Sequence, residues 1–302
     1  MPLRQNTGSV VCPSCGRLVG VRDKACFNCG RGYPGLFGFA PLLGRFGRSA
    51  SFGELMFWSC GAIFLITVLL KPDGIMGSGG FLSLLAPNTA VLRLFGASGL
   101  VPILQDGRWW TVLSAGFLHG GIIHIYFNLS GLRPLIAEVE NVLGLGRTII
   151  IYTVASVSGF ALTSLVRLLT AIYVPWIDGT FFRFLAGAGL SVGASAAICG
   201  LVGALMAYGQ RTGQFHMQRY ARNSMIAVLI MGVLLPFIDN WAHLGGFAGG
   251  YLATRLMRPL EKESPAHLLG GLICLVLMAA SLVASIVHGL KLYPQWLAMY
   301  QQ

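Results

Sequence analysis

The chain of 302 residues is 55% hydrophobic and only 10% charged. Soluble domains carry roughly a quarter of charged residues, so this composition excludes an ordinary soluble domain. Among the stretches without Asp, Glu, Lys or Arg, seven are candidate spans: residues 55–70, 111–132, 148–166, 184–210, 223–238, 240–254 and 268–290. Because a helix needs about 20 apolar residues to cross a bilayer, these stretches predict an all-α polytopic membrane protein with six or seven spans.

The formal net charge of +11 would suggest a nucleic-acid partner in a soluble protein. Here the distribution of charge gives another explanation. If the N-terminus is cytoplasmic and the spans alternate, most of the 21 Lys and Arg residues fall in cytoplasmic segments, as the positive-inside rule requires. We therefore expect a cytoplasmic N-terminus and a lipid bilayer as the surroundings, and we do not expect nucleic acid as a partner.

The first segment, residues 1–33, contains two Cys-x-x-Cys pairs, each followed by glycine: Cys12 with Cys15, and Cys26 with Cys29. Four thiolates in so short a stretch are typical of a structural zinc site, and the metal would fold a segment too small for a core. Two disulfides or a redox pair are the alternatives, and a reducing cytoplasmic location disfavours the disulfides. We expect a zinc-ribbon-like segment, with a protein partner for it left open.

Residues 34–53 mix Phe and Leu with Gly and Arg and are predicted to be a linker, which could lie on the membrane surface. Beyond it, polar side chains inside the apolar stretches are candidates for function, because they are costly in a bilayer. His124 and Asn128 are four residues apart and share a helix face. His119 and His124 are five apart, about 140° around one helix, and are not expected to converge as metal ligands.

Ser195 and His243 lie in two glycine-rich stretches. Gly193 precedes the serine, and Gly246 and Gly250 follow the histidine at three and seven residues. Small residues at such spacing let helices approach closely in lipid, which would bring the hydroxyl within reach of the imidazole. Helix packing alone explains most membrane serines, but an imidazole is the general base that a serine nucleophile needs near neutral pH.

A transporter is a further alternative, with the histidines as a proton relay. It would predict paired intramembrane carboxylates or inverted repeats, and the sequence has neither.

Several motifs, in this order, resemble those of the rhomboid family of intramembrane serine proteases. They are GRWWTVLSAGFLHGGIIHIYFNLSGL, EVENVLGLGRTIIIYTVASVSG, GASAAICGLVGA and AHLGGFAGGYL, and the resemblance covers roughly residues 54–254. It implies a rhomboid-like six-helix catalytic core over residues 54–258. Residues 259–302 would then form a loop and a seventh, C-terminal transmembrane helix with a short tail.

The resemblance also implies roles for individual residues. Ser195 would be the nucleophile and His243 the general base of a dyad without a carboxylate, since Asp239 is read as a helix cap or water contact. The remaining site residues would be His124, Asn128 and the Ser195 N–H in the oxyanion hole, with His119 and Gly193 lining the site. Ser98, in the similar string GASG, has no histidine partner implied and is read as a non-catalytic residue.

The implied activity is hydrolysis of transmembrane protein substrates through an acyl-enzyme, with no cofactor needed for catalysis. The site would open toward the non-cytoplasmic face of a bacterial inner membrane. Three residues depart from the family pattern: Ala196 and Cys199 after the serine, and Thr111 in the first loop. They put efficiency in question, and a catalytically silent protein that binds transmembrane segments is the alternative.

Overall fold

We describe the protein from a computed structural model. The structure describes residues 5–12, 16–38, 51–70, 84–179, 182, 185–235 and 238–300. Cys15 and most of the predicted linker, residues 39–50, lie outside these ranges. The chain divides into two compact units, Met1–Leu55 and Met56–Gln302.

The N-terminal unit is built on a small antiparallel sheet. Strand β1 (Ser9–Val11) pairs with β2 (Leu18–Gly20) so that Val10 lies opposite Val19. The side chains of these two valines turn inward, together with Val21, Cys12 and Cys26. A short 3₁₀ turn, Leu36–Gly38, follows. Strands of three residues and so small a core are too little to hold a fold by burial alone.

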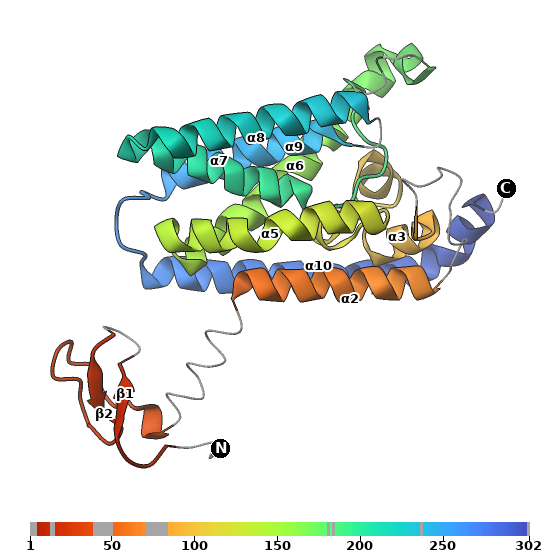
Figure 1. Cartoon of the computed structure of the whole chain (residues 1–302). Coiled ribbons are helices and arrows are strands. Elements are labelled where there is room, and N and C mark those ends of the chain that lie inside the picture. Colours follow the sequence, from red (N-terminus) through yellow and green to blue (C-terminus); the bar gives the residue numbers. More distant parts are fainter. Residues whose placement is uncertain are drawn as a thin grey trace. The chain divides into compact units, whose positions relative to one another are not determined.

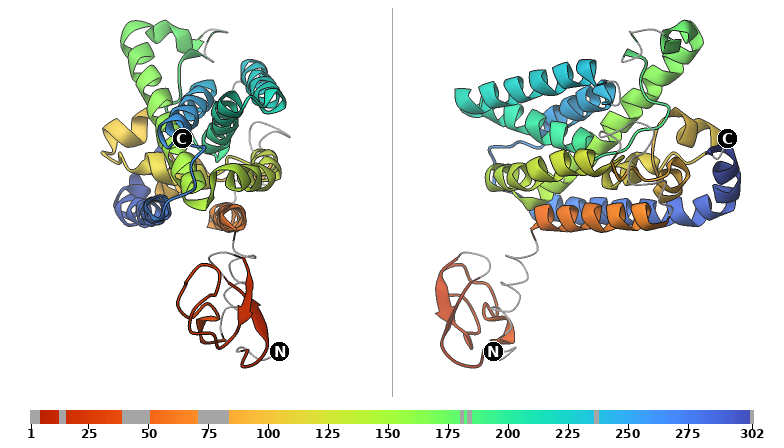
Figure 2. Two further views of the ribbon diagram at one scale, coloured as in Figure 1. Left: turned by 90° about the vertical axis from the view of Figure 1, so that its left-hand side faces the viewer. Right: turned by 45° about the vertical axis from the view of Figure 1, so that its right-hand side comes forward.

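The second unit is all helical (Figure 1). Its long helices are α2 (Phe52–Leu70), α5 (Ile122–Leu143), α6 (Leu145–Tyr173), α7 (Ser195–Thr212), α8 (Phe215–Leu234), α9 (Asn240–Leu256) and α10 (Pro265–Tyr300). The shorter elements are α3 (Thr89–Phe95), η3 (Val101–Gln105), α4 (Thr111–Ser114), η4 (Ala115–Phe117) and η5 (Pro175–Gly179). The axes of most long helices are roughly aligned with one another, and the view along these axes shows α6 tilted across the bundle (Figure 2).

The described residues contain one long helix in each of the seven apolar stretches of the sequence. By length and composition, α2, α6 and α10 are apolar enough to cross a membrane singly. The segments Thr111–Phe117 and Ile122–Leu143 pass the same test together, although the chain bends by 93° between them. The chain is therefore an all-α polytopic membrane protein.

Two apolar stretches are not the continuous helices that their composition suggested. Residues 111–132 break after Phe117, where Leu118 is extended, and the long helix begins only at Ile122. Residues 185–194 are not in an α-helix, because Gly193 has a φ of 128° and its N–H donates to the carbonyl of Ala115 at 3.0 Å. Apolar composition predicts burial but not whether the backbone is a continuous helix. The two breaks place His119, His124 and Ser195 at or near the starts of α5 and α7.

The segment that follows α3 is joined to the segment that precedes α7. Ser98 and Ser191 form an antiparallel bridge, with Ser98 N donating to Ser191 O at 3.0 Å. The bridge joins the segment after α3 to the segment that leads into Ser195. Residues far apart in sequence thus hold the approach to α7 in place.

Helix α10 is fixed to this segment by two buried arginines. Arg93 forms an ion pair with Asp106 at 2.7 Å, and its guanidinium lies 4.5 Å from the centre of the Trp296 ring. Arg108 is fully buried and donates to the carbonyl of Ser285 at 2.8 Å. Burial lowers the pKa of Arg108 to about 10, so the group stays charged at neutral pH. Arginines with so many partners are anchors, because their removal leaves buried carbonyls without donors.

Candidate active site

Ser195 and His243 are in hydrogen-bond contact. Ser195 is the first residue of α7, and His243 lies in the first turn of α9. The distance from His243 Nε2 to Ser195 Oγ is 2.9 Å. The imidazole is buried and the serine is half-buried. A hydroxyl at this distance from a ring nitrogen has the geometry that general-base activation requires.

Glycines make this contact possible. A Cβ added to Gly246 of α9 would meet the backbone of Ala196, and one added to Gly250 would meet the carbonyl of Gly200. The two helices therefore touch through their backbones at successive turns. Any side chain at these positions would separate α7 from α9 and move the imidazole away from the hydroxyl.

Helix α6 closes the other side of α9. Gly159 of α6 lies against the carbonyl of Ala242, where an added Cβ would be 2.6 Å from that oxygen. Ser158 Oγ donates to the carbonyl of Gly245 at 2.9 Å. The histidine-bearing helix is thus held between two neighbours, and its rotation about its own axis is fixed by close packing.

Asp239 caps α9, and within the described ranges its carboxylate forms no hydrogen bond with the imidazole. Its carboxylate accepts hydrogen bonds from Ala242 N at 3.1 Å, Thr163 Oγ1 at 2.9 Å and Ser191 Oγ at 2.8 Å. The predicted capping role of Asp239 is confirmed. His243 Nδ1 is buried and has no hydrogen-bond partner in the part of the chain that the structure describes. Among the residues that the structure describes, no carboxylate orients the ring.

The imidazole of His124 also lies near the serine. A Cβ added to Gly193 would lie 2.7 Å from His124 Nε2 and 3.5 Å from Ser195 Oγ, so the ring nitrogen lies against the glycine beside the nucleophile candidate. Gly120 N–H donates to His124 Nδ1 at 3.2 Å. Because Nδ1 accepts this bond, we assign the ring proton to Nε2, where it faces the site.

Asn128 lies one turn further along α5. Its Nδ2 donates to the carbonyl of His124 at 2.8 Å, and its Oδ1 is buried without a partner among the described residues. The amide thus supports the turn that carries His124. One N–H of the amide group is used in this way, and the second remains for a ligand.

The relation of His119 to His124 differs from the prediction. The two rings lie in edge contact, with centroids 5.2 Å apart, and His119 is fully buried. The prediction placed both residues on one helix, about 140° apart. It was wrong because α5 begins only at Ile122, so that His119 reaches the site from the extended segment before the helix.

Ser98 forms no hydrogen bond with a histidine within the part of the chain that the structure describes. It is fully buried, and its Oγ accepts a bond from Thr111 Oγ1 at 3.3 Å. Thr111 also donates to the carbonyl of Arg108 at 2.8 Å. Ser98 therefore belongs to the bridge with Ser191. Thr111, one of the three departures from the family pattern, forms hydrogen bonds with Ser98 and Arg108. Cys199, the second departure, is a buried residue of α7.

The predicted zinc ligands lie in the N-terminal unit. The thiol groups of Cys12, Cys26 and Cys29 lie within 4.8 Å of one another. Sequence reasoning missed three residues that shape the active site: Ala115, whose carbonyl holds Gly193, and Thr163 and Ser191, which bind Asp239. A buried hydroxyl or carbonyl of this kind has no signal in a single sequence.

The fold and the site together define a helical integral membrane protein with a serine and a histidine joined at the starts of two closely packed helices. The sequence profile described as the Rhomboid domain matches residues 106–260, more than half of the chain. The matched range includes both members of the pair. The chain belongs to the rhomboid family.

Curated relatives include proteins with and without activity in their names. The chain is 31% identical over 170 residues to rhomboid protease GluP of Bacillus subtilis, and the matched region covers 55% of this chain and 29% of that protein. It is 29% identical over 182 residues to RHOMBOID-like protein 1 of Arabidopsis thaliana, covering 58% and 42%. Inactive RHOMBOID-like protein 8 of the same plant is 26% identical over 192 residues, covering 61% and 49%. The chain spans less than half the length of each of these relatives.

Proposed function

We propose that the protein is a serine endopeptidase that hydrolyses peptide bonds of transmembrane substrates through a dyad of Ser195 and His243. The observation that carries the proposal is the contact of 2.9 Å between His243 Nε2 and Ser195 Oγ. Membership in a family with members named as proteases supports it. Packing alone would bring a serine and a histidine together less often than it brings apolar side chains together, because both cost free energy in a bilayer.

In the proposed reaction, Ser195 Oγ attacks the scissile carbonyl carbon while His243 Nε2 takes the hydroxyl proton. The tetrahedral intermediate collapses to an acyl-enzyme, and the protonated imidazole gives its proton to the leaving amine. A water molecule, deprotonated by His243, then attacks the ester and releases the second product. Each step needs only one base that is neutral at rest.

The negative charge of the intermediate needs donors, and three groups are suited to supply them. His124 Nε2–H faces the serine across Gly193, and Asn128 has one N–H beyond its bond to His124. The third is the N–H of Ser195, since the first N–H groups of a helix have no partner within the helix. We assign these groups to the oxyanion hole, where donors act on charge that develops in the transition state. His119 and Gly193 line the site.

The absence of an orienting carboxylate has a consequence for rate. In this proposal the packing of α9 between α6 and α7 holds the imidazole of His243. Among the described residues, no carboxylate bonded to Nδ1 helps to orient the ring. A dyad of this kind lacks the stabilisation that a carboxylate gives to the imidazolium. We therefore expect slow turnover compared with soluble triad proteases.

The membrane places limits on the substrate. We propose that the N-terminus is cytoplasmic, because most Lys and Arg residues then lie on the cytoplasmic side. With this orientation the starts of α7 and α9 lie toward the non-cytoplasmic face of a bacterial inner membrane. A transmembrane helix entering from the bilayer would have to unwind near that face to present a peptide bond to Ser195.

A second candidate is a silent protein that binds transmembrane segments without cleaving them. The 26% identical relative named as inactive favours keeping it. The presence of both Ser195 and His243 in contact argues for activity. The two candidates differ in one property, the nucleophilicity of Ser195.

A fluorophosphonate probe measures that property without knowledge of the substrate. We would label the full-length protein in detergent and in liposomes, and compare the wild type with Ser195→Ala, His243→Ala and the matched control Ser98→Ala. The proposal predicts labelling of the wild type and the control, and none of the two dyad variants. Absence of labelling in a folded wild type, in both environments, would overturn it in favour of the silent protein.

A further inference from the structure

The N-terminal unit repeats one backbone arrangement around two of its cysteines. Gly16 N–H donates to the carbonyl of Cys12 at 2.9 Å, and Gly30 N–H donates to that of Cys26 at 2.9 Å. In return, Cys12 N–H donates to the carbonyl of Arg17, and Cys26 N–H to that of Arg31, both at 2.8 Å. Two segments of different sequence thus have the same hydrogen bonds at the same spacing.

The glycine in each repeat is required by its conformation. Gly16 has a φ of 73° and Gly30 a φ of 72°, in the left-handed region that other residues adopt only with strain. These glycines let the chain turn back directly after the second cysteine of each pair. Each glycine therefore allows a tight turn beside a cysteine-containing segment.

The thiol groups converge as metal ligands would. The Sγ atoms of Cys12 and Cys29 are 3.8 Å apart, and Cys26 completes a group within 4.8 Å. Four thiolates at about 2.3 Å from a tetrahedral zinc ion lie about 3.8 Å from one another. A disulfide would bring two sulfurs to about 2.05 Å, much closer than the 3.8 Å between Cys12 Sγ and Cys29 Sγ.

The unit also needs such a centre. Its buried cluster has five members, of which Cys12 and Cys26 are two. A chain of this size normally requires disulfides, metal or oligomerisation to fold. A metal bound by these two thiolates would join both turns to the sheet.

We propose that Cys12, Cys26 and Cys29 bind a structural zinc ion. From the sequence pattern alone, Cys15, a residue outside the described ranges, is the expected fourth ligand. Four thiolates fill a tetrahedral ion and leave no place for water or substrate. The ion therefore holds the unit together and takes no part in peptide hydrolysis.

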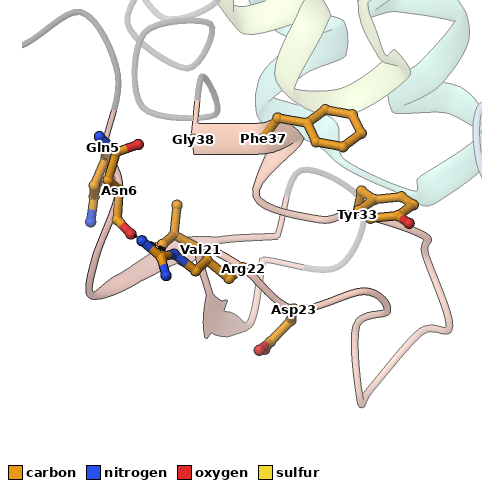
Figure 3. Close-up of a pocket in the computed structure, with 8 residues that line it drawn as sticks. All are labelled: Gln5, Asn6, Val21, Arg22, Asp23, Tyr33, Phe37 and Gly38. Carbon is orange, nitrogen blue, oxygen red and sulfur yellow. Dashed lines mark hydrogen bonds between the residues drawn. The ribbon is translucent and has the colours of Figure 1, made fainter.

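The same unit has a cavity of about 300 Å³ whose lining does not include Cys12, Cys26 or Cys29, and Figure 3 shows its lining residues. Its lining consists of Gln5, Asn6, Val21, Arg22, Asp23, Tyr33, Phe37 and Gly38. One of these, Val21, belongs to the buried cluster that contains Cys12 and Cys26. Loss of the metal should therefore open the lining as well as the turns.

The metal content of the full-length protein tests the proposal. We would purify it under reducing conditions with zinc supplied, and measure zinc and iron per chain by plasma mass spectrometry. Variants Cys26→Ser and Cys29→Ser remove ligands, and Cys274→Ser, in α10, is the matched control. The proposal predicts one zinc ion per chain in the wild type and the control, and at least a tenfold loss in the two ligand variants.

A second readout does not depend on how well the variants retain metal. Limited trypsin digestion of the full-length wild type, with and without a chelator, reports whether the turns at Arg17 and Arg31 are held. The proposal predicts cleavage there at least ten times faster after chelation. A wild type without zinc, zinc that persists in both ligand variants, or cleavage unchanged by the chelator would overturn the proposal, and iron in place of zinc would overturn the choice of metal.

Discussion

Replacing Asp239 by asparagine distinguishes a dyad from a triad. If the carboxylate oriented His243, the substitution would lower the rate by roughly 10⁴-fold, as it does where a triad carboxylate becomes an amide. The carboxylate is instead engaged by Thr163, Ser191 and Ala242 N. We therefore expect Asp239→Asn to lower the rate of fluorophosphonate labelling by less than about tenfold, or about 1.4 kcal/mol.

The stability effect can be worked from the same bonds. Asparagine keeps one acceptor for the cap, and its amide can donate to Ser191 Oγ, so we expect a loss of about 1 kcal/mol in the free energy of unfolding. Asp239→Ala removes the helix cap, worth about 1 kcal/mol, and two bonds to a charged acceptor, so a loss of about 3 kcal/mol or more is expected.

Thermal unfolding in detergent and labelling rates at 25 °C measure the two effects separately. The reasoning is refuted if Asp239→Asn unfolds like the wild type and yet loses labelling by three or more orders of magnitude. That result would mean that the carboxylate acts on the imidazole. An Asp239→Ala variant as stable as the wild type would contradict the assignment of the cap.

Three further substitutions test the packing and the metal. Gly193→Ala places a Cβ against His124 Nε2 at a backbone φ of 128°. The resulting strain of about 1–3 kcal/mol should reduce fluorophosphonate labelling about tenfold or more. Unaltered labelling would exclude the close approach of Gly193 to His124. Gly250→Val meets the Gly200 carbonyl and should destabilise the protein by about 1–3 kcal/mol; an unchanged unfolding temperature would contradict the backbone contact of α7 with α9. Cys26→Ser should remove zinc and change the labelling rate by less than about twofold, or about 0.4 kcal/mol in activation free energy, because the chain forms two compact units. Loss of labelling would show that the metal supports the active site.

The sequence predicts the pairing of Ser195 with His243 because the glycines that allow it lie close to each residue in the sequence. Gly246 and Gly250 repeat at four residues, and that spacing alone predicts a helix face that another backbone can approach. The exclusion of Ser98 had a similar basis, since no histidine lies near it in the implied fold. The catalytic roles themselves remain proposals that geometry supports.

The parts that sequence could not supply depend on backbone breaks and long-range bonds. Composition cannot reveal that α5 begins at Ile122, and this start decides whether His119 meets His124. The bonds of Asp239 to Thr163 and Ser191 join three segments through hydroxyl groups that look ordinary in the sequence. Buried polar contacts of this kind are set by the fold as a whole.

The most direct test of the central claim is to find the residue that the fluorophosphonate modifies. The labelled full-length protein would be digested, and the adduct assigned to a residue by tandem mass spectrometry. The account predicts a single adduct on Ser195 that is absent from the His243→Ala variant. An adduct on Ser98 or another serine, or one on Ser195 that persists without His243, would contradict the proposed dyad.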